Sequence, residues 1–185
     1  MTRVPGDWVA DILHFWFDEI PREAWFGKEE AFDQRLRERF LAHHEHIAVL
    51  PVADCVRAAE TAMASVIALD QFPRNMFRST PRAFATDAKA REIADRAIVN
   101  GFEAALSKDE RSFLYLPYQH AEDAVAQARG VDLMAKLEDT ELTRWALAHK
   151  DVIDRFGRFP HRNNVLGRMS TPEEIAFLAQ PDSSF

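Results

Sequence analysis

Apolar residues recur along most of this chain at the three- and four-residue spacing of amphipathic helices. The pattern predicts helices over residues 8–17, 28–49, 54–72, 86–100, 107–120, 121–137, 141–156 and 171–179. In the clearest of them, Leu142, Trp145, His149, Val152 and Phe156 lie on one stripe. No segment alternates with period two for long enough to be a strand. We therefore expect an all-α fold of about seven to eight helices.

Short connections join the predicted helices, so consecutive helices should pack as antiparallel hairpins. The length of 185 residues, without a linker rich in Gly, Ser or Pro, predicts a single helical domain over residues 1–185. Pro51 and Gly157 each follow a patterned helix, and Pro117 should kink or end the helix that contains it. Thr171-Pro172-Glu173-Glu174 has the residues of a capping box and should open the last helix.

Composition and charge narrow the class of protein. The chain is 47% hydrophobic and contains 14 Phe, which is enough for a packed core. A net charge of −7 disfavours a nucleic-acid partner and an anionic membrane surface, and we expect neither. The longest mainly apolar run, near residues 62–69, is far short of the roughly 20 residues that a membrane helix needs. With Cys55 as its one cysteine and no visible secretory signal, the protein is expected in the cytoplasm.

Three ionisable residues interrupt otherwise apolar helix faces. Asp70 continues the stripe of its helix, His149 lies in the middle of the stripe over residues 142–156, and His120 continues a third stripe. Burying a carboxylate without a partner is costly, so Asp70 requires a cation or several donors. Arg74, four residues later, is the obvious cation, either as a corner-locking ion pair or as part of a site.

Two short polar segments resemble each other, and each closes a patterned helix. Gln71-Phe72-Pro73-Arg74-Asn75 follows the helix with Asp70, and Arg158-Phe159-Pro160-His161-Arg162-Asn163 follows the helix with His149. Around them, residues 72–84 and 155–168 contain arginines but no acidic residue. Such runs suit an anion, to which the asparagines add neutral donors. We hypothesise that the fold brings these two Phe-Pro corners near one polar site.

The candidate site combines the two corners with the acidic residues beside His120. A histidine that an acid orients could move a proton, so His120 and His149 are the candidate catalytic residues. The candidate ligand-binding residues are Asp70, Arg74, Asn75, Glu122, Asp123, Arg158, His161, Arg162 and Asn163. We expect no metal and no cofactor, because the spacings fit no established zinc pattern, phosphate loop or nucleophile elbow.

Several segments match the motifs of one bacterial family. They are Leu13-His14-Phe15-Trp16-Phe17, Trp25-Phe26-Gly27, Leu69-Asp70-Gln71-Phe72-Pro73-Arg74-Asn75, Leu114-Tyr115-Leu116-Pro117-Tyr118-Gln119-His120, Glu122-Asp123, Arg155-Phe156-Gly157-Arg158-Phe159-Pro160-His161-Arg162-Asn163 and the tail Ser183-Ser184-Phe185. On these segments the chain resembles the family catalogued as domain of unknown function 924. The resemblance spans nearly the whole chain and implies an all-α, tetratricopeptide-like superhelix, but no activity. Residues 52–59 depart from it, because relatives have a longer and more polar connection there.

Three interpretations of the polar residues remain open. In the first, which we favour, a buried pocket binds a small anionic molecule, with cofactor-independent hydrolysis or proton transfer as its chemistry. In the second, a tetratricopeptide-like module binds an acidic peptide of a partner protein through Arg74, Arg78 and Arg158. In the third, the polar residues form an internal network that fixes helix register, and the arginines pair with acids on other helices. A homodimer is compatible with each interpretation.

Overall fold

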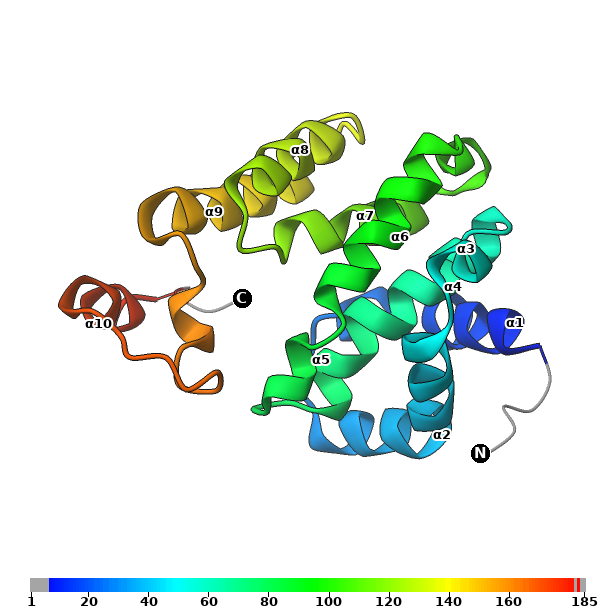
Figure 1. Ribbon diagram of the computed structural model, residues 1–185, viewed down its shortest axis with the longest axis horizontal. Helices are drawn as coiled ribbons and strands as arrows, with labels where there is room; N and C mark the ends of the chain where they lie inside the picture. Colours follow the sequence, from blue (N-terminus) through cyan, green and yellow to red (C-terminus); the bar gives the residue numbers. More distant parts are fainter. Residues whose placement is uncertain (1–6, 182, 184–185) are drawn as a thin grey trace. The chain divides into compact units, whose positions relative to one another are not determined.

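A computed structural model of the chain describes residues 7–181 and 183. These residues form helices joined by turns and no β-strand, which confirms the all-α class (Figure 1). None of the helices in this described part is both long enough and apolar enough to cross a bilayer. The α-helices are α1 (Trp8–Leu13), α2 (Glu30–Val49), α3 (Val52–Cys55), α4 (Ala59–Val66), α5 (Phe72–Met76), α6 (Asp87–Val99), α7 (Lys108–Gln119), α8 (Ala124–Ala135), α9 (Thr140–Phe156) and α10 (Pro172–Leu178). The π-helical turns are η1 (His14–Glu19) and η3 (Ile67–Gln71), and the 3-10 turns are η2 (Arg22–Ala24), η4 (Pro81–Phe84), η5 (Phe102–Ala105) and η6 (Pro160–Arg162).

The predicted helix over residues 54–72 differs most from the structure. The short helix α3 ends at Cys55, and the long helix begins only at Ala59. It then continues beyond its predicted end, because α4, η3 and α5 follow one another without a break to Met76. Pro73 does not stop it, although Pro73 lacks a backbone N–H, because side chains bond the carbonyls that precede it. Pro117 lies inside α7, which continues to Gln119, so Pro117 does not end that helix at its own position.

The described residues form two compact units. The first unit runs through Arg78 and from Arg82 to Pro117, and the second takes Ser79–Pro81 and the residues from Tyr118 onward. The first Phe-Pro corner belongs to the first unit, and the second corner belongs to the second unit. The single domain and the tetratricopeptide-like superhelix stay predictions.

An aromatic core holds the first unit together. Phe15, Trp16, Phe40 and Phe72 are all fully buried. The ring centroids lie 4.7 Å apart for Phe15 and Phe40, 5.0 Å for Phe40 and Phe72, and 5.7 Å for Trp16 and Phe72. Such aromatic pairs add to the stability that their buried area already provides. Because Phe72 opens α5, this core fixes the position of the first Phe-Pro corner.

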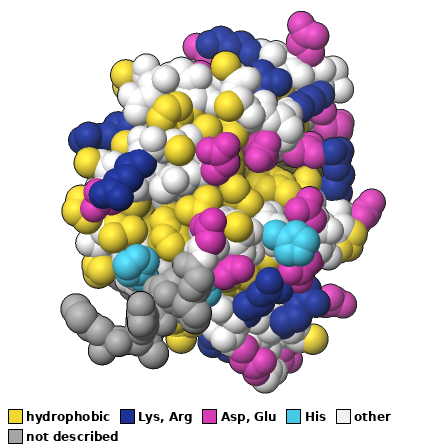
Figure 2. Space-filling model, turned by 90° about the vertical axis from the view of Figure 1, so that its right-hand side faces the viewer, with side chains coloured by type: hydrophobic (Ala, Val, Ile, Leu, Met, Phe, Trp, Pro, Cys, Tyr) yellow, Lys and Arg dark blue, Asp and Glu magenta, His cyan; other side chains and the backbone are white. Residues whose placement is uncertain are grey.

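Some hydrophobic side chains of the first unit remain exposed to solvent. Val49 at the end of α2 and Val99 at the end of α6 are each 81% exposed. Figure 2 shows hydrophobic side chains gathered in the middle of one face of the molecule, with acidic side chains beside them. Isolated exposed valines are ordinary in proteins, and neither belongs to the candidate site.

The second unit is built on the helical hairpin of α8 and α9 (Figure 1). Asp139 caps α9 by accepting hydrogen bonds from the backbone N–H groups of Glu141 and Leu142. Gly157 ends the same helix with a φ of +69°, as its position after the predicted helix suggested. From the tail that resembles the family's ending, Ser183 donates a hydrogen bond to the Leu178 carbonyl at 3.1 Å. Ser184 and Phe185 lie outside the described residues.

Candidate functional site

The first Phe-Pro corner follows a π-helical turn whose carbonyls are bonded by side chains. Within η3, the chain approaches Pro73, which has no backbone N–H to donate to a preceding carbonyl. Side chains from three elements take over: His44 Nδ1 bonds Ala68 O at 2.9 Å, Thr86 Oγ1 donates to Leu69 O at 2.6 Å, and Arg74 Nη1 donates to Asp70 O. Single π turns inside α-helices are frequent at functional sites. This one fixes the orientation of Asp70 and Arg74.

The Asp70 carboxylate is fully buried and pairs with Arg74. Arg74 Nη1 lies 3.5 Å from Asp70 Oδ1, and Gln71 Nε2 donates to Oδ2 at 2.5 Å. Arg74 also donates to both carboxylate oxygens of Asp87, each at 3.1 Å. The ion pair predicted from the spacing of Asp70 and Arg74 is thus confirmed. Since Asp87 is the first residue of α6, the ion pair between Arg74 and Asp87 also joins α5 to α6.

Asn75 and Arg78 converge on Asp33 of α2. Asn75 Nδ2 donates to Asp33 Oδ1 at 2.8 Å, and Arg78 donates from Nε to Oδ2 at 2.7 Å and from Nη2 to Oδ1 at 2.9 Å. Bidentate arginine–carboxylate pairs are among the strongest hydrogen-bonded pairs in proteins. The sequence did not indicate Asp33, because it lies on a helix that is rich in charged residues and looked solvated. The side chains of the first corner therefore join α5 to both α2 and α6.

In the second corner, Glu122 and Arg168 hold the backbone of Phe159 from both sides. Glu122 Oε1 accepts the Phe159 N–H at 2.8 Å, and Arg168 Nη2 donates to the Phe159 carbonyl at 3.2 Å. The two charged groups pair with each other through N···O distances of 2.6 and 2.9 Å. Burial alone would raise the pKa of Glu122, but Arg168 and the Phe159 N–H outweigh it and hold this pKa below its ordinary value. Glu122 is therefore ionised, and it positions Phe159.

Arg158 and Asn163 bind the carboxylate of Glu174. Arg158 donates to both carboxylate oxygens, at 2.7 and 2.9 Å, and Asn163 Nδ2 donates to Oε2 at 3.1 Å. The hydrogen bond from Arg158 lowers the pKa of Glu174 to about 2. The same carboxylate accepts the Thr171 N–H at 2.8 Å, which confirms the predicted capping box. Arg158 and Asn163 thus fix α10 to the corner.

His149, His161 and Arg162 lie against the ring of Phe159, and His120 lies next to His149. The ring centroids of His149 and His161 lie 5.8 and 5.6 Å from that of Phe159, which is fully buried. The His120 ring lies 6.2 Å from the His149 ring, and Arg162 Cζ lies 4.5 Å from the Phe159 ring centroid. We call His120, His149, His161 and Arg162, with Phe159, the histidine cluster. All of its members belong to the second unit.

His149 is neutral in this cluster. It is 8% exposed, and burial lowers its pKa first, followed by the charges of His120, Arg162 and His161, to about 3. Its Nδ1 lies 2.8 Å from the Trp145 carbonyl oxygen. A carbonyl only accepts hydrogen bonds, so Nδ1 carries the proton and Nε2 carries the lone pair. His149 therefore combines a proton-accepting nitrogen with one cationic neighbour, Arg162, and two neighbouring histidines.

The structure divides the predicted site residues into two sets. Asp70, Arg74 and Asn75 lie in the first unit, whereas the others lie in the second. Within the second set, Asp123 caps α8 by accepting the Ala126 N–H at 2.9 Å. The hypothesis that both corners line one site stays a prediction. Among the residues that the structure describes, no three His, Cys, Asp or Glu side chains are grouped in a way that could hold a metal ion.

Three residues that build the second corner were not among the predicted site residues. Phe159 lay inside a polar motif, where it looked like part of a turn. Arg168 lay in a run without acids that suggested anion binding, whereas its partner Glu122 is 46 residues away and no spacing rule connects them. Glu174 was predicted only as part of the capping box, so its hydrogen bonds to Arg158 were not expected.

The fold and these corners define a class: all-helical proteins with charged side chains buried in hydrogen-bonded networks. The model of a bacterial family of proteins of unknown function, DUF924, matches residues 12–182, and the chain belongs to this family. A solved structure of a protein of unknown function from Agrobacterium tumefaciens is similar, with 44% sequence identity and a TM-score of 0.87. The match covers 92% of this chain and 96% of that chain. A search of curated proteins found no match.

Proposed function

We propose that the histidine cluster binds a small anionic molecule and that His149 exchanges a proton with it. The observation that supports this most directly is the neutral state of His149 beside three groups that carry or can carry positive charge. Burial keeps the ring uncharged, and His120, Arg162 and His161 lower its pKa further. A buried group with a strongly shifted pKa among specific charge partners is a typical candidate for a functional residue.

Anion binding would change the protonation of His149. A negative charge beside Arg162 offsets the positive field that lowers the pKa of His149, so this pKa rises when the ligand binds. Binding at neutral pH or slightly below is therefore coupled to proton uptake by the protein. A side chain whose proton affinity responds to its ligand can act as a general base before the reaction and as a general acid afterwards.

The residues suggest a division of labour. Arg162 carries a planar guanidinium group, which suits a carboxylate or a phosphate. His149 Nε2 would accept a proton from the ligand or from water, and Glu122 would act indirectly, by holding Phe159 in place. Proton transfer or hydrolysis without a cofactor fits this inventory.

Calorimetric titration with inorganic phosphate and with succinate tests the proposal. When the titration is repeated in buffers of different ionisation enthalpy, the observed heat should depend on the buffer, because the protein takes up protons.

Arg162→Met should abolish binding, while the matched control Arg155→Met, which changes an exposed arginine on α9, should bind normally. His149→Gln should lose the proton uptake and keep its melting temperature at pH 7. Buffer-independent heats would contradict the role of His149, and failure of both anions to bind would contradict the site itself.

The cellular location and the second interpretation also remain proposals. We place the protein in the cytoplasm, because its one cysteine, Cys55, is buried and free. A tetratricopeptide-like module that recruits an acidic peptide is the alternative function. However, Arg74 already donates to both carboxylate oxygens of Asp87, and Arg158 already donates to both carboxylate oxygens of Glu174. A peptide would have to displace these carboxylates, so we rank this function second.

A further inference from the structure

An open groove runs along the outer face of α9, apart from the proposed anion site. It has a volume of about 620 Å³, and none of the histidine-cluster residues lines it. Thr140, Arg144, Leu147 and Asp151 follow one another at the spacing of a single helix face, which forms the floor of the groove. The remaining lining residues are Ala135, Glu138, Asp139, Thr143 and Ala148.

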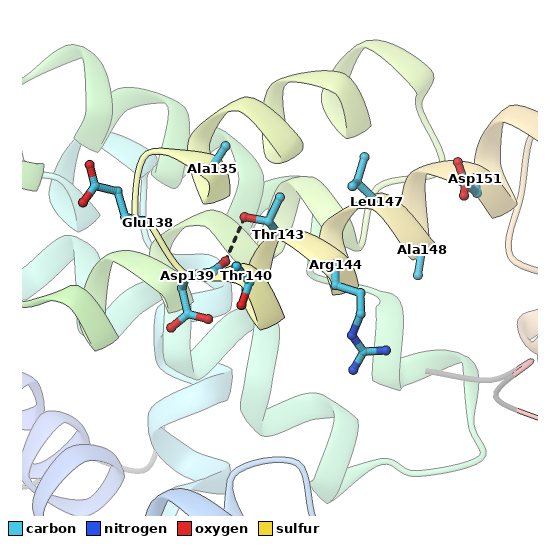
Figure 3. A pocket seen from close by; sticks show the side chains of 9 residues that line it. All are labelled: Ala135, Glu138, Asp139, Thr140, Thr143, Arg144, Leu147, Ala148 and Asp151. Carbon is cyan, nitrogen blue, oxygen red and sulfur yellow. Dashed lines mark hydrogen bonds between the residues drawn. The ribbon is translucent and has the colours of Figure 1, made fainter.

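The groove is apolar in the middle and acidic towards its ends. Leu147 is 45% exposed, although a leucine at a helix surface is usually turned inward. Figure 3 shows Glu138 towards one end and Asp151 towards the other, with Leu147 between them. From the helical rise, the floor from Thr140 to Asp151 is about 16 Å long.

The charges in the groove are unbalanced. Arg144, its one basic lining residue, donates to Glu141 at 2.7 Å and is thus matched by an acid outside the lining. Asp139 uses its carboxylate to cap α9. Glu138 and Asp151 are both exposed, and they leave a negative charge near each end of an apolar floor. A partner should therefore have an apolar centre and positive charges on both sides of it.

We propose that this groove docks a basic amphipathic helix of another protein. The apolar face of such a helix would cover Leu147 and Ala148, and a lysine or arginine near each end would meet Glu138 and Asp151. Helices that lie in a groove and are anchored at one-turn intervals are a common mode of peptide recognition. A floor of about 16 Å accommodates about 11 helical residues, or three turns. The inference does not depend on the proposed anion site.

Fluorescence anisotropy of the full chain with designed helical peptides tests this inference. The probe is a peptide of about 14 residues with a leucine stripe and lysines at both ends. The matched peptide carries glutamates in place of the lysines. The lysine peptide should bind and the glutamate peptide should not. Leu147→Asp and the double variant Glu138→Lys/Asp151→Lys should each weaken binding about tenfold or more, because the first removes the central apolar contact and the second removes the charge partners at both ends.

A charge reversal outside the groove separates docking from general charge attraction. Glu173→Lys changes an exposed acid on α10 outside the groove and should leave the affinity for the lysine peptide unchanged. Equal binding of both peptides, no binding of the lysine peptide, or an equal loss in Glu173→Lys would each overturn the inference. A concentration-dependent dimer that Leu147→Asp abolishes would also overturn it, since the occupant would then be a second copy of the chain.

Discussion

The Glu122 carboxylate accepts the backbone N–H of Phe159 at 2.8 Å, across 37 residues of sequence. Arg168 completes the arrangement by bonding both Glu122 and the Phe159 carbonyl. Phe159 carries the ring against which His149 and His161 pack. The position of the histidine cluster therefore depends on an ion pair that contains none of its members.

Replacing Glu122 with glutamine should destabilise the protein by about 1–3 kcal/mol at pH 7, because it removes the charged partner of Arg168 and weakens the bond to Phe159. Burial raises and Arg168 lowers the pKa of Glu122, with a net decrease on folding. The ionised carboxylate therefore stabilises the fold above its unfolded pKa, and this contribution is lost as the pH falls through the folded pKa. Urea denaturation should show a constant difference between the proteins above about pH 5 and a smaller one below about pH 4.

The matched control for this experiment is Asp132→Asn, at an exposed position of α8. It changes the charge by the same amount but leaves the Phe159 backbone untouched. If both variants lose the same stability at every pH, the Glu122–Arg168 pair does not hold the corner.

His149 should make the fold sensitive to acid. Burial, together with His120, Arg162 and His161, lowers its pKa to about 3 in the folded state, and the ordinary value is about 6.5. The unfolded chain therefore binds a proton between these values, whereas the folded protein does not. Stability is fully present above about pH 6.5 and falls as the pH decreases, by about 2 kcal/mol between pH 7 and pH 5. His149→Gln should lack this component in urea denaturation over the same range.

Two other buried histidines do not obscure the result. Burial also lowers the pKa of His43 and of His44, but both residues are present in the wild type and in the variant. The difference between the two proteins therefore isolates His149. An unchanged acid response in His149→Gln would show that His149 is protonated in the fold at pH 5.

Thr86 should be required for the π turn before Pro73. Its hydroxyl donates to the Leu69 carbonyl at 2.6 Å and does not cap α6, although Thr86 stands at the cap position. Thr86→Val should destabilise the protein by about 1–3 kcal/mol, because it leaves a buried carbonyl without this donor. Thr86→Ser should recover most of the loss. Urea denaturation of the three proteins tests this, and a loss in Thr86→Ser with no loss in Thr86→Val would mean that the methyl group matters and the hydroxyl does not.

The sequence predicted what depends on neighbours along the chain. The helices followed from their apolar spacing, Gly157 marked the end of α9, and the Asp70–Arg74 pair followed from its one-turn separation. It did not predict η3, because the carbonyls of that turn are bonded by residues from α2 and from the start of α6. The path through Pro73 depends on these distant donors, so local rules for proline placed the helix end too early.

The residue types of the candidate site could be predicted from the sequence, but the contacts between these residues could be predicted only in part. His120 and His149 were candidates because each lies on an otherwise apolar stripe, and the structure does place the centroids of their rings 6.2 Å apart. Phe159, against which His149 and His161 pack, was missed, since a buried phenylalanine carries no chemical signal of its own. The partners of the arginines were also missed, because any of 30 acidic residues could have supplied them.

Gly130 gives the last prediction, because a glycine within a helix normally lowers stability by about 1 kcal/mol relative to alanine. In α8, however, a Cβ on Gly130 would lie only 3.0 Å from the Cβ of Tyr118, whose side chain is buried. Gly130→Ala should therefore destabilise the protein. The overpacking costs about 1–3 kcal/mol, and the better helix propensity of alanine offsets part of this cost. The reverse change at a nearby exposed position, Ala128→Gly, should cost about 1 kcal/mol through propensity alone. Urea denaturation that found Gly130→Ala more stable than wild type would show that Tyr118 moves aside and that the close approach of α8 is not needed.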